Sequence, residues 1–349
     1  MGSDVTELIV HIGAGKTGST AIQFSLRDVG ADVLASQGTT YAGLMLESLP
    51  GGSDHDWCEH GAPQKFFQAR ETERTDEEVY QFLSATLKRL KAQGQRQLVW
   101  SNEAFLVQNA RIIPILQRLS RDGVPLRVIA YVRRHDARAR SAYVEFGIKS
   151  KRYKGDLKTF GEWVDSNTVT YGENLALWQA AFPDALRLYN FDAAGDVGAH
   201  FCDQIGLKDI PSVRANESPS KALLAVWSVF NGDNPDPTWA NDFRRMARPL
   251  KLNRDDTRPV PPLDELMPDA DDLRALQDRC ADDLEAVNAI LARQGQPLME
   301  FGEPKARDEG VSSWEMDRTL LRMVFSLQRQ VQQLKREIRE IKSEKGDGE

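Results

Sequence analysis

Short apolar segments alternate with amphipathic ones over most of the chain, and this alternation predicts an α/β fold. Four segments are short and apolar enough to be buried strands, at residues 7–12, 97–101, 126–132 and 185–191. Between and after them, helical patterns cover 21–27, 76–92, 112–119, 135–150 and 196–206. Strands that alternate with helices form βαβ units, so we expect a parallel sheet with helices on both faces.

The pattern changes beyond this region, and the change suggests one large domain over 1–300. After a core over 1–230, an extension over 231–300 begins with an irregular stretch rich in Pro, Asn and Asp. The extension ends with a helical pattern at 273–292, and residues 301–312 have the composition of a linker. We therefore expect an α/β domain with a helical extension, joined by a linker to a further segment.

That last segment, residues 313–345, carries a repeat of apolar positions spaced alternately four and three residues apart. They are Leu320, Val324, Leu327, Val331, Leu334, Ile338 and Ile341. Arg, Gln, Lys and Glu fill most positions between them, which is typical of a coiled-coil helix. We expect this helix to make the protein a homo-oligomer, although the same stripe could instead pack on its own domain.

Composition excludes several classes of protein. Of 349 residues, 41% are hydrophobic, which is enough for a sizeable core and excludes wholesale disorder. The three cysteines are far apart, so no zinc module is expected and a reducing compartment is favoured. No apolar run approaches the ~20 residues that cross a membrane, and the N-terminus lacks a signal-peptide pattern. We expect a cytoplasmic protein without a membrane span.

The net charge of −7 hides a strongly basic segment. Residues 133–154 contain eight Lys or Arg against two acids, whereas residues 264–285 contain nine acids against two Arg. A basic segment in an acidic chain favours one site for an anionic ligand over a nucleic-acid surface, with a solvated helix face as the alternative.

The loop between the first strand and helix, His11 to Thr20 (HIGAGKTGST), has the features of a phosphate site. Small residues let backbone N–H groups converge on an anion at a helix N-terminus, where the helix dipole is favourable. Lys16 adds a positive charge, and three hydroxyls add donors. The residues expected to bind are Gly15, Lys16, Thr17, Gly18, Ser19 and Thr20.

A second candidate anion site begins at Arg133, at the carboxyl end of a predicted strand, where open α/β sheets bind ligands. Ser141 follows eight residues later, about two turns into the next helix. An arginine fork and a hydroxyl suit a second phosphate, distinct from the one at the loop.

Together the two motifs resemble those of the sulfotransferases that use 3'-phosphoadenosine 5'-phosphosulfate (PAPS). The loop is similar to their 5'-phosphosulfate loop, and Arg133 with Ser141 is similar to their 3'-phosphate motif, with Arg138 and Tyr143 at further family positions. The likeness continues more loosely to about residue 295, and it is closer to the bacterial and carbohydrate type than to the cytosolic small-molecule type. Two pairs of residues depart from the family: Ala14-Gly15 replaces a bulkier residue and Pro, and Arg134-His135 replaces Asp-Pro.

The resemblance implies a fold like that of P-loop NTPases and transfer of a sulfonate group from PAPS to a hydroxyl or amine, without a metal. Lys16 would neutralise the charge that develops on the leaving phosphate and the sulfonate oxygens. A general base must take the acceptor's proton, and the candidates are Glu103 first and His135 second. His55 and His60 are further rivals. The expected product is adenosine 3',5'-bisphosphate.

The acceptor is expected to be a saccharide or another small metabolite. The basic side chains at 149, 151, 152 and 154 suit an acidic saccharide, unless they form a solvated face. The tryptophans at 57, 163 and 178 suit sugar stacking or a core.

Two other functions stay open at this point. One is a nucleoside-triphosphate-dependent P-loop kinase, against which the chain has Val10 where a Walker A loop needs Gly and no strand ending in Asp to hold magnesium. The other is a coiled-coil scaffold with a degenerate nucleotide domain.

Overall fold

The computed structural model describes residues 6–58, 64–167, 169–211, 221–232, 234–246, 263–304 and 313–346. These residues form two compact units, each built from separate stretches of the chain. The first unit takes the described residues within Met1–Arg138, Val169–Glu217 and Leu276–Gly302, and the second those within Ala139–Thr168, Ser218–Ala275 and Glu303–Glu349.

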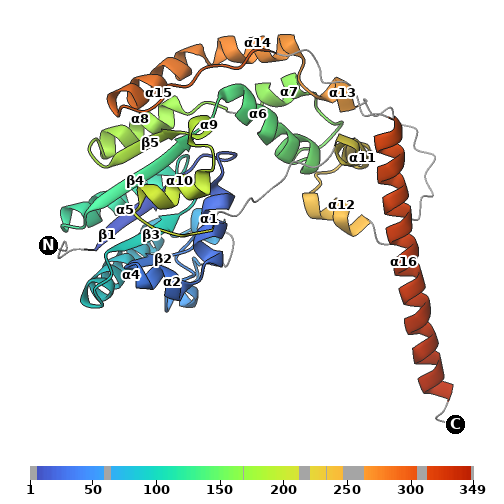
Figure 1. The fold of residues 1–349 in the computed structure, drawn as a ribbon, viewed down its shortest axis with the longest axis horizontal. Coiled ribbons are helices and arrows are strands. Elements are labelled where there is room, and N and C mark those ends of the chain that lie inside the picture. The colour runs from blue at the N-terminus through green and yellow to red at the C-terminus, as the bar shows by residue number, and fades with distance from the viewer. Residues whose placement is uncertain are drawn as a thin grey trace. The chain divides into compact units, whose positions relative to one another are not determined.

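The first unit is built on a five-stranded, entirely parallel sheet in the order β2-β3-β1-β4-β5 (Figure 1). The strands are β1 (Glu7–His11), β2 (Thr39–Tyr41), β3 (Gln97–Ser101), β4 (Leu126–Val132) and β5 (Leu186–Asn190). In register, His11 pairs with Ser101 of β3 and with Ile129 of β4. Because the strands are parallel, the loops that follow β1, β3 and β4 leave from the same edge of the sheet.

Helices cover both faces of this sheet, as the sequence predicts. The helices of this unit are α1 (Ser19–Asp28), α2 (Ala31–Ser36), η1 (Gly52–Asp54), α3 (Gln64–Phe67), α4 (Thr72–Ala92), α5 (Asn109–Arg121), α8 (Gly172–Ala181), α9 (Phe191–Ala194), α10 (Val197–Gln204) and α15 (Ala281–Arg293). On one face α1 and α10 pack against apolar side chains such as Ile9 and Val99. On the other face α4, α5, α8 and α15 cover Val10 and Trp100.

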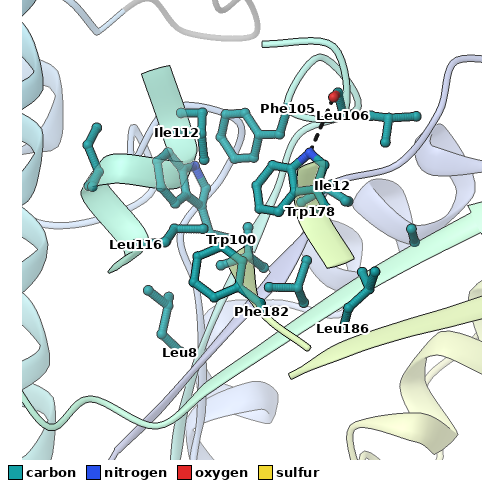
Figure 2. Close-up of a cluster of buried hydrophobic side chains, with 14 of the residues drawn as sticks. Leu8, Ile12, Trp100, Phe105, Leu106, Ile112, Leu116, Trp178, Phe182 and Leu186 are labelled. Carbon is teal, nitrogen blue, oxygen red and sulfur yellow. Dashed lines mark hydrogen bonds between the residues drawn. The ribbon is translucent and has the colours of Figure 1, made fainter. Parts of the chain in front are cut away.

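Two buried tryptophans, Trp100 and Trp178, pack in the core on the second face of the sheet (Figure 2). Trp178 of α8 is fully buried, and its indole N–H donates to the Leu106 carbonyl at 3.2 Å. Trp100 of β3 donates to the Leu44 carbonyl at 2.9 Å. The Leu106 N–H donates to the Ile12 carbonyl at 3.2 Å. These bonds satisfy polar groups inside an apolar core and fix the segment after β3 against the end of β1.

Several elements differ from those expected. β2 has only three residues, Thr-Thr-Tyr, and carries no pattern of its own. The expected helix at 273–292 is two helices, α14 (Ala270–Arg279) and α15, separated at Cys280. The expected helix at 135–150 is α6 (His135–Tyr143) followed by a π-helical turn, η2 (Val144–Lys149).

The division into two units does not follow the boundary expected at residue 230, because each unit contains residues from both sides of it. Val287 and Leu291 of α15 are fully buried in the core of the first unit, so the end of the helical extension belongs with the sheet. Burial of these apolar side chains against α8 and β5 supplies the driving force.

The second unit is helical. Its helices include α7 (Phe160–Asp165), α11 (Lys221–Gly232), α12 (Ala240–Met246), α13 (Leu263–Leu266) and α16 (Ser313–Gly346). Within this unit, α11 packs against η2, α13 and α16. Among the residues that the structure describes, no helix is both long enough and apolar enough to pass through a membrane.

Candidate functional site

The loop between β1 and α1 adopts a backbone that most residues avoid. Gly13, Lys16 and Gly18 have φ values of 48°, 72° and 83°. A Cβ at Gly13 would lie 2.8 Å from the Ser19 hydroxyl and 3.0 Å from Glu103 Cα, so only glycine fits there. A lysine at positive φ costs about 1–2 kcal/mol, and such strain is concentrated at functional sites. The fold therefore forces Lys16 into this loop conformation.

Thr17 shapes the loop from inside. Its side chain is fully buried, and its hydroxyl donates to the Ala14 carbonyl at 2.6 Å and accepts from the Ala14 N–H at 3.3 Å. In this structure the hydroxyl proton of Thr17 is used inside the loop.

The N-terminus of α1 has the properties of an anion site. Its N-cap is Gly18, and no side chain caps it, so the first N–H groups of the helix keep their hydrogen-bonding capacity. The Ser19 hydroxyl is buried and has no hydrogen-bond partner among the described residues. An unsatisfied buried hydroxyl costs about 1–3 kcal/mol, which an anion bound at this helix end would recover.

The second motif meets this loop at the same edge of the sheet. Arg133 Nη1 lies 3.5 Å from the Lys16 carbonyl, and Arg138 Nε lies 3.4 Å from the Gly15 carbonyl. Both contacts are long for hydrogen bonds, but they place the two motifs side by side although more than 100 residues separate them.

Arg133 also carries an unsatisfied donor. Its Nε atom is buried and has no hydrogen-bond partner in the described part of the chain. The nearest carboxylate oxygen, on Asp192, is 3.8 Å from Nε, and the guanidinium lies 5.0 Å above the Phe191 ring. A guanidinium held by an aromatic ring and a distant carboxylate retains capacity for an anion.

Glu103 lies beside the phosphate-like loop. The Asn102 N–H donates to the His11 carbonyl at 3.0 Å, which ties this segment to the end of β1. The Glu103 side chain is exposed, and the Gln23 amide of α1 donates to its Oε2 at 3.0 Å. An exposed carboxylate next to the loop is accessible to an acceptor molecule.

The histidine candidates have different surroundings. His135 is fully buried, and its Nε2 lies 2.6 Å from an Asp283 carboxylate oxygen, so in this conformation the ring does not face an acceptor. His55 stacks on Trp57, with ring centroids 4.7 Å apart. His60 lies outside the described residues. Of the candidates for the base that the structure describes, Glu103 is the one with an exposed side chain beside the loop.

His11 is a neutral part of the core. Its Nδ1 lies 2.8 Å from the Ser101 hydroxyl, and burial lowers its pKa to about 3. The ring therefore carries no charge that could hold an anion at neutral pH.

Ser141 lies near the end of α6, in the second unit, and its expected contact with a phosphate stays a prediction. Thr20 is the second residue of α1 and is half-buried.

Of the side chains considered for the acceptor, all three tryptophans (Trp57, Trp163 and Trp178) are buried in cores. Lys151 is buried too, and its ammonium donates to the Gly155 carbonyl at 2.7 Å. Arg152 lies 5.2 Å above the ring of Trp239, whose side chain is 56% exposed. In the second unit, Trp239 with Arg152 suits a sugar surface better than the three expected tryptophans do.

Three residues of this region were not expected from the sequence. Gln23 follows Ser19 by four residues and so shares its face of α1, a signal that could have identified it. Tyr171 and Asp283 gave no such signal: Asp283 is one of nine acids in the segment 264–285. Only their contacts with Arg133 and His135 single them out.

Comparison of the chain with protein-family models and with curated proteins found no match. Within the described residues, no group of three or more His, Cys, Asp or Glu side chains is arranged to hold a metal ion.

Proposed function

We propose that this protein is a sulfotransferase that moves a sulfonate group from PAPS to a hydroxyl or amine of an acceptor, such as a saccharide or other small metabolite. The observation that carries the proposal is a pair of buried donors, the Ser19 hydroxyl and Arg133 Nε, for which the described residues supply no hydrogen-bond acceptor, in two motifs at one sheet edge. A nucleotide with a phosphate at each end would satisfy both donors. The P-loop-like loop and the resemblance of both motifs add support.

Different side chains at this edge have different roles in the proposed reaction. PAPS, when bound, supplies an activated sulfonate group. Lys16 and the N-terminus of α1 hold negative charge at the loop, and Arg133 holds the second phosphate. Glu103, oriented by Gln23, takes the proton from the acceptor hydroxyl.

Ligand-dependent thermal unfolding tests this proposal against its two alternatives. Adenosine 3',5'-bisphosphate should raise the Tm, because a ligand at 100 times its Kd adds about 2.7 kcal/mol to the stability of the folded state. ATP with magnesium should add less. A larger shift with ATP and magnesium would instead favour a P-loop kinase, and no shift with either would favour a scaffold.

The helix α16 supports a further part of the proposal, self-association as a coiled coil. Five of its repeating apolar side chains are between 44% and 56% exposed: Leu320, Val324, Val331, Leu334 and Ile338. They lie on one stripe with a 3.5-residue repeat, and a second copy of the helix would bury them. We propose a parallel dimer, because β-branched residues alternate with Leu in the central part of the stripe.

Light scattering on the full chain should therefore give the mass of a dimer, and truncation before Ser313 should give a monomer. Val331→Glu should also weaken the dimer, because it places a charge in the apolar seam. Arg336→Glu is the matched control, since position 336 faces away from that seam. A full-length monomer at high protein concentration would refute the coiled coil.

A further inference from the structure

One partly buried carboxylate, that of Asp283 in the first turn of α15, joins three segments of the first unit. Its Oδ2 lies 2.6 Å from His135 Nε2 and accepts from the Tyr171 N–H at 3.0 Å, while its Oδ1 accepts from the Gly172 N–H. Burial by itself raises the pKa of Asp283, but these hydrogen bonds outweigh it and hold the pKa below its usual range. The carboxylate is therefore charged at neutral pH, and it fixes the start of α8 against the start of α6.

Tyr171 extends this connection to the arginine motif. Its side chain is fully buried, and its hydroxyl donates to the Arg133 carbonyl at 2.9 Å and accepts from the Arg133 N–H at 3.2 Å. Its ring lies 4.6 Å from the Arg138 guanidinium. Arg138 also donates to the Val169 carbonyl at 2.6 Å, two residues before Tyr171. One phenol thus holds the backbone of one arginine and packs against the other.

The two hydrogen bonds to Arg133 replace sheet pairing at the point where pairing ends. Val132 is the last residue of β4 paired with β5, so beyond it the neighbouring strand no longer fixes the chain. A guanidinium on a long, flexible side chain binds a phosphate more tightly when its backbone is already fixed, because less entropy is lost on binding.

We infer that Tyr171, held in place by Asp283, is a positioning residue that makes Arg133 selective for a nucleotide with a 3'-phosphate. The inference rests on the proposed function, since it takes Arg133 to bind that phosphate. Neither residue touches the nucleotide itself; both act through the backbone and ring contacts described above.

The test compares the affinities of adenosine 3',5'-bisphosphate and adenosine 5'-phosphate by calorimetry in the full-length protein. Tyr171→Phe removes only the hydroxyl, so it should weaken binding of the bisphosphate about fivefold to tenfold and leave the affinity for the monophosphate within about twofold of wild type. Asp283→Asn should shift the ratio of the two affinities in the same direction. The matched control is Tyr189→Phe, which removes the hydroxyl of another buried tyrosine, bonded to Gln204 Oε1 at 2.8 Å, and should leave the ratio of the two affinities unchanged.

The outcomes separate this inference from the proposed function. If the wild-type protein does not prefer the bisphosphate, the proposed function itself fails. If the wild type prefers it and both variants keep the ratio seen in Tyr189→Phe, the positioning role is overturned. Loss of cooperative unfolding in both variants would also overturn it, because the contacts would then hold the fold together and not the arginine.

Discussion

Glu103→Gln should lower the rate of sulfonate transfer by roughly 10²–10⁴-fold and leave PAPS affinity nearly unchanged. Glutamine keeps the size and hydrogen bonding of the side chain but removes its basicity, and a general base acts chiefly in the transition state. Turnover would be measured with an acceptor from a screen of saccharides and small phenols, and donor affinity by calorimetry.

Lys16→Ala provides the contrast for this experiment. It should slow turnover too, but it should also weaken the nucleotide, because Lys16 is proposed to contact the bound anion. His135→Gln tests the competing assignment. Near-native turnover in Glu103→Gln, together with a folded but inactive His135→Gln, would move the role of base to His135.

Arg133→Ala should weaken the binding of adenosine 3',5'-bisphosphate by about 2 kcal/mol, or roughly 30-fold in affinity, and change the binding of adenosine 5'-phosphate far less. The reason is that one charge-assisted contact to the 3'-phosphate is lost, whereas the loop that holds the other phosphate is intact. Both affinities can be measured by calorimetry on the same preparation.

Arg127→Ala is the matched control for that substitution. Arg127 lies near the start of β4, the strand that ends just before Arg133, so it is at the opposite edge of the sheet. There its guanidinium pairs with the carboxylate of Glu7, at the start of β1, 2.6 Å away. It should leave both affinities unchanged. Equal weakening of the two nucleotides by Arg133→Ala would contradict the assignment of Arg133 to the 3'-phosphate.

Much of the fold follows from local patterns. Apolar segments bounded by amphipathic helices predicted four of the five strands and the parallel sheet, because burial on both faces requires continuous apolar strands. The same reasoning predicted that Glu103 would lie beside the phosphate-like loop, since the carboxyl ends of parallel strands share one edge. The edge strand β2 was not predicted, because three residues are too few to carry a period.

Contacts between segments far apart in the sequence decided the remaining features of the fold and of the site. Nothing in the order of residues separates Asp283 from its acidic neighbours, and only the return of α15 to the sheet brings its carboxylate to His135. The return of α15 also explains the surroundings of His135, one of the positions where the sequence departs from the sulfotransferase pattern. Its imidazole is buried against a carboxylate 148 residues away. The sequence alone thus determined which elements form and which edge of the sheet carries the loops, because hydrophobic period and strand direction are local properties. The tertiary structure decided which side chains are buried, paired or left with unsatisfied donors at that edge, because these depend on segments that meet only when the chain has folded.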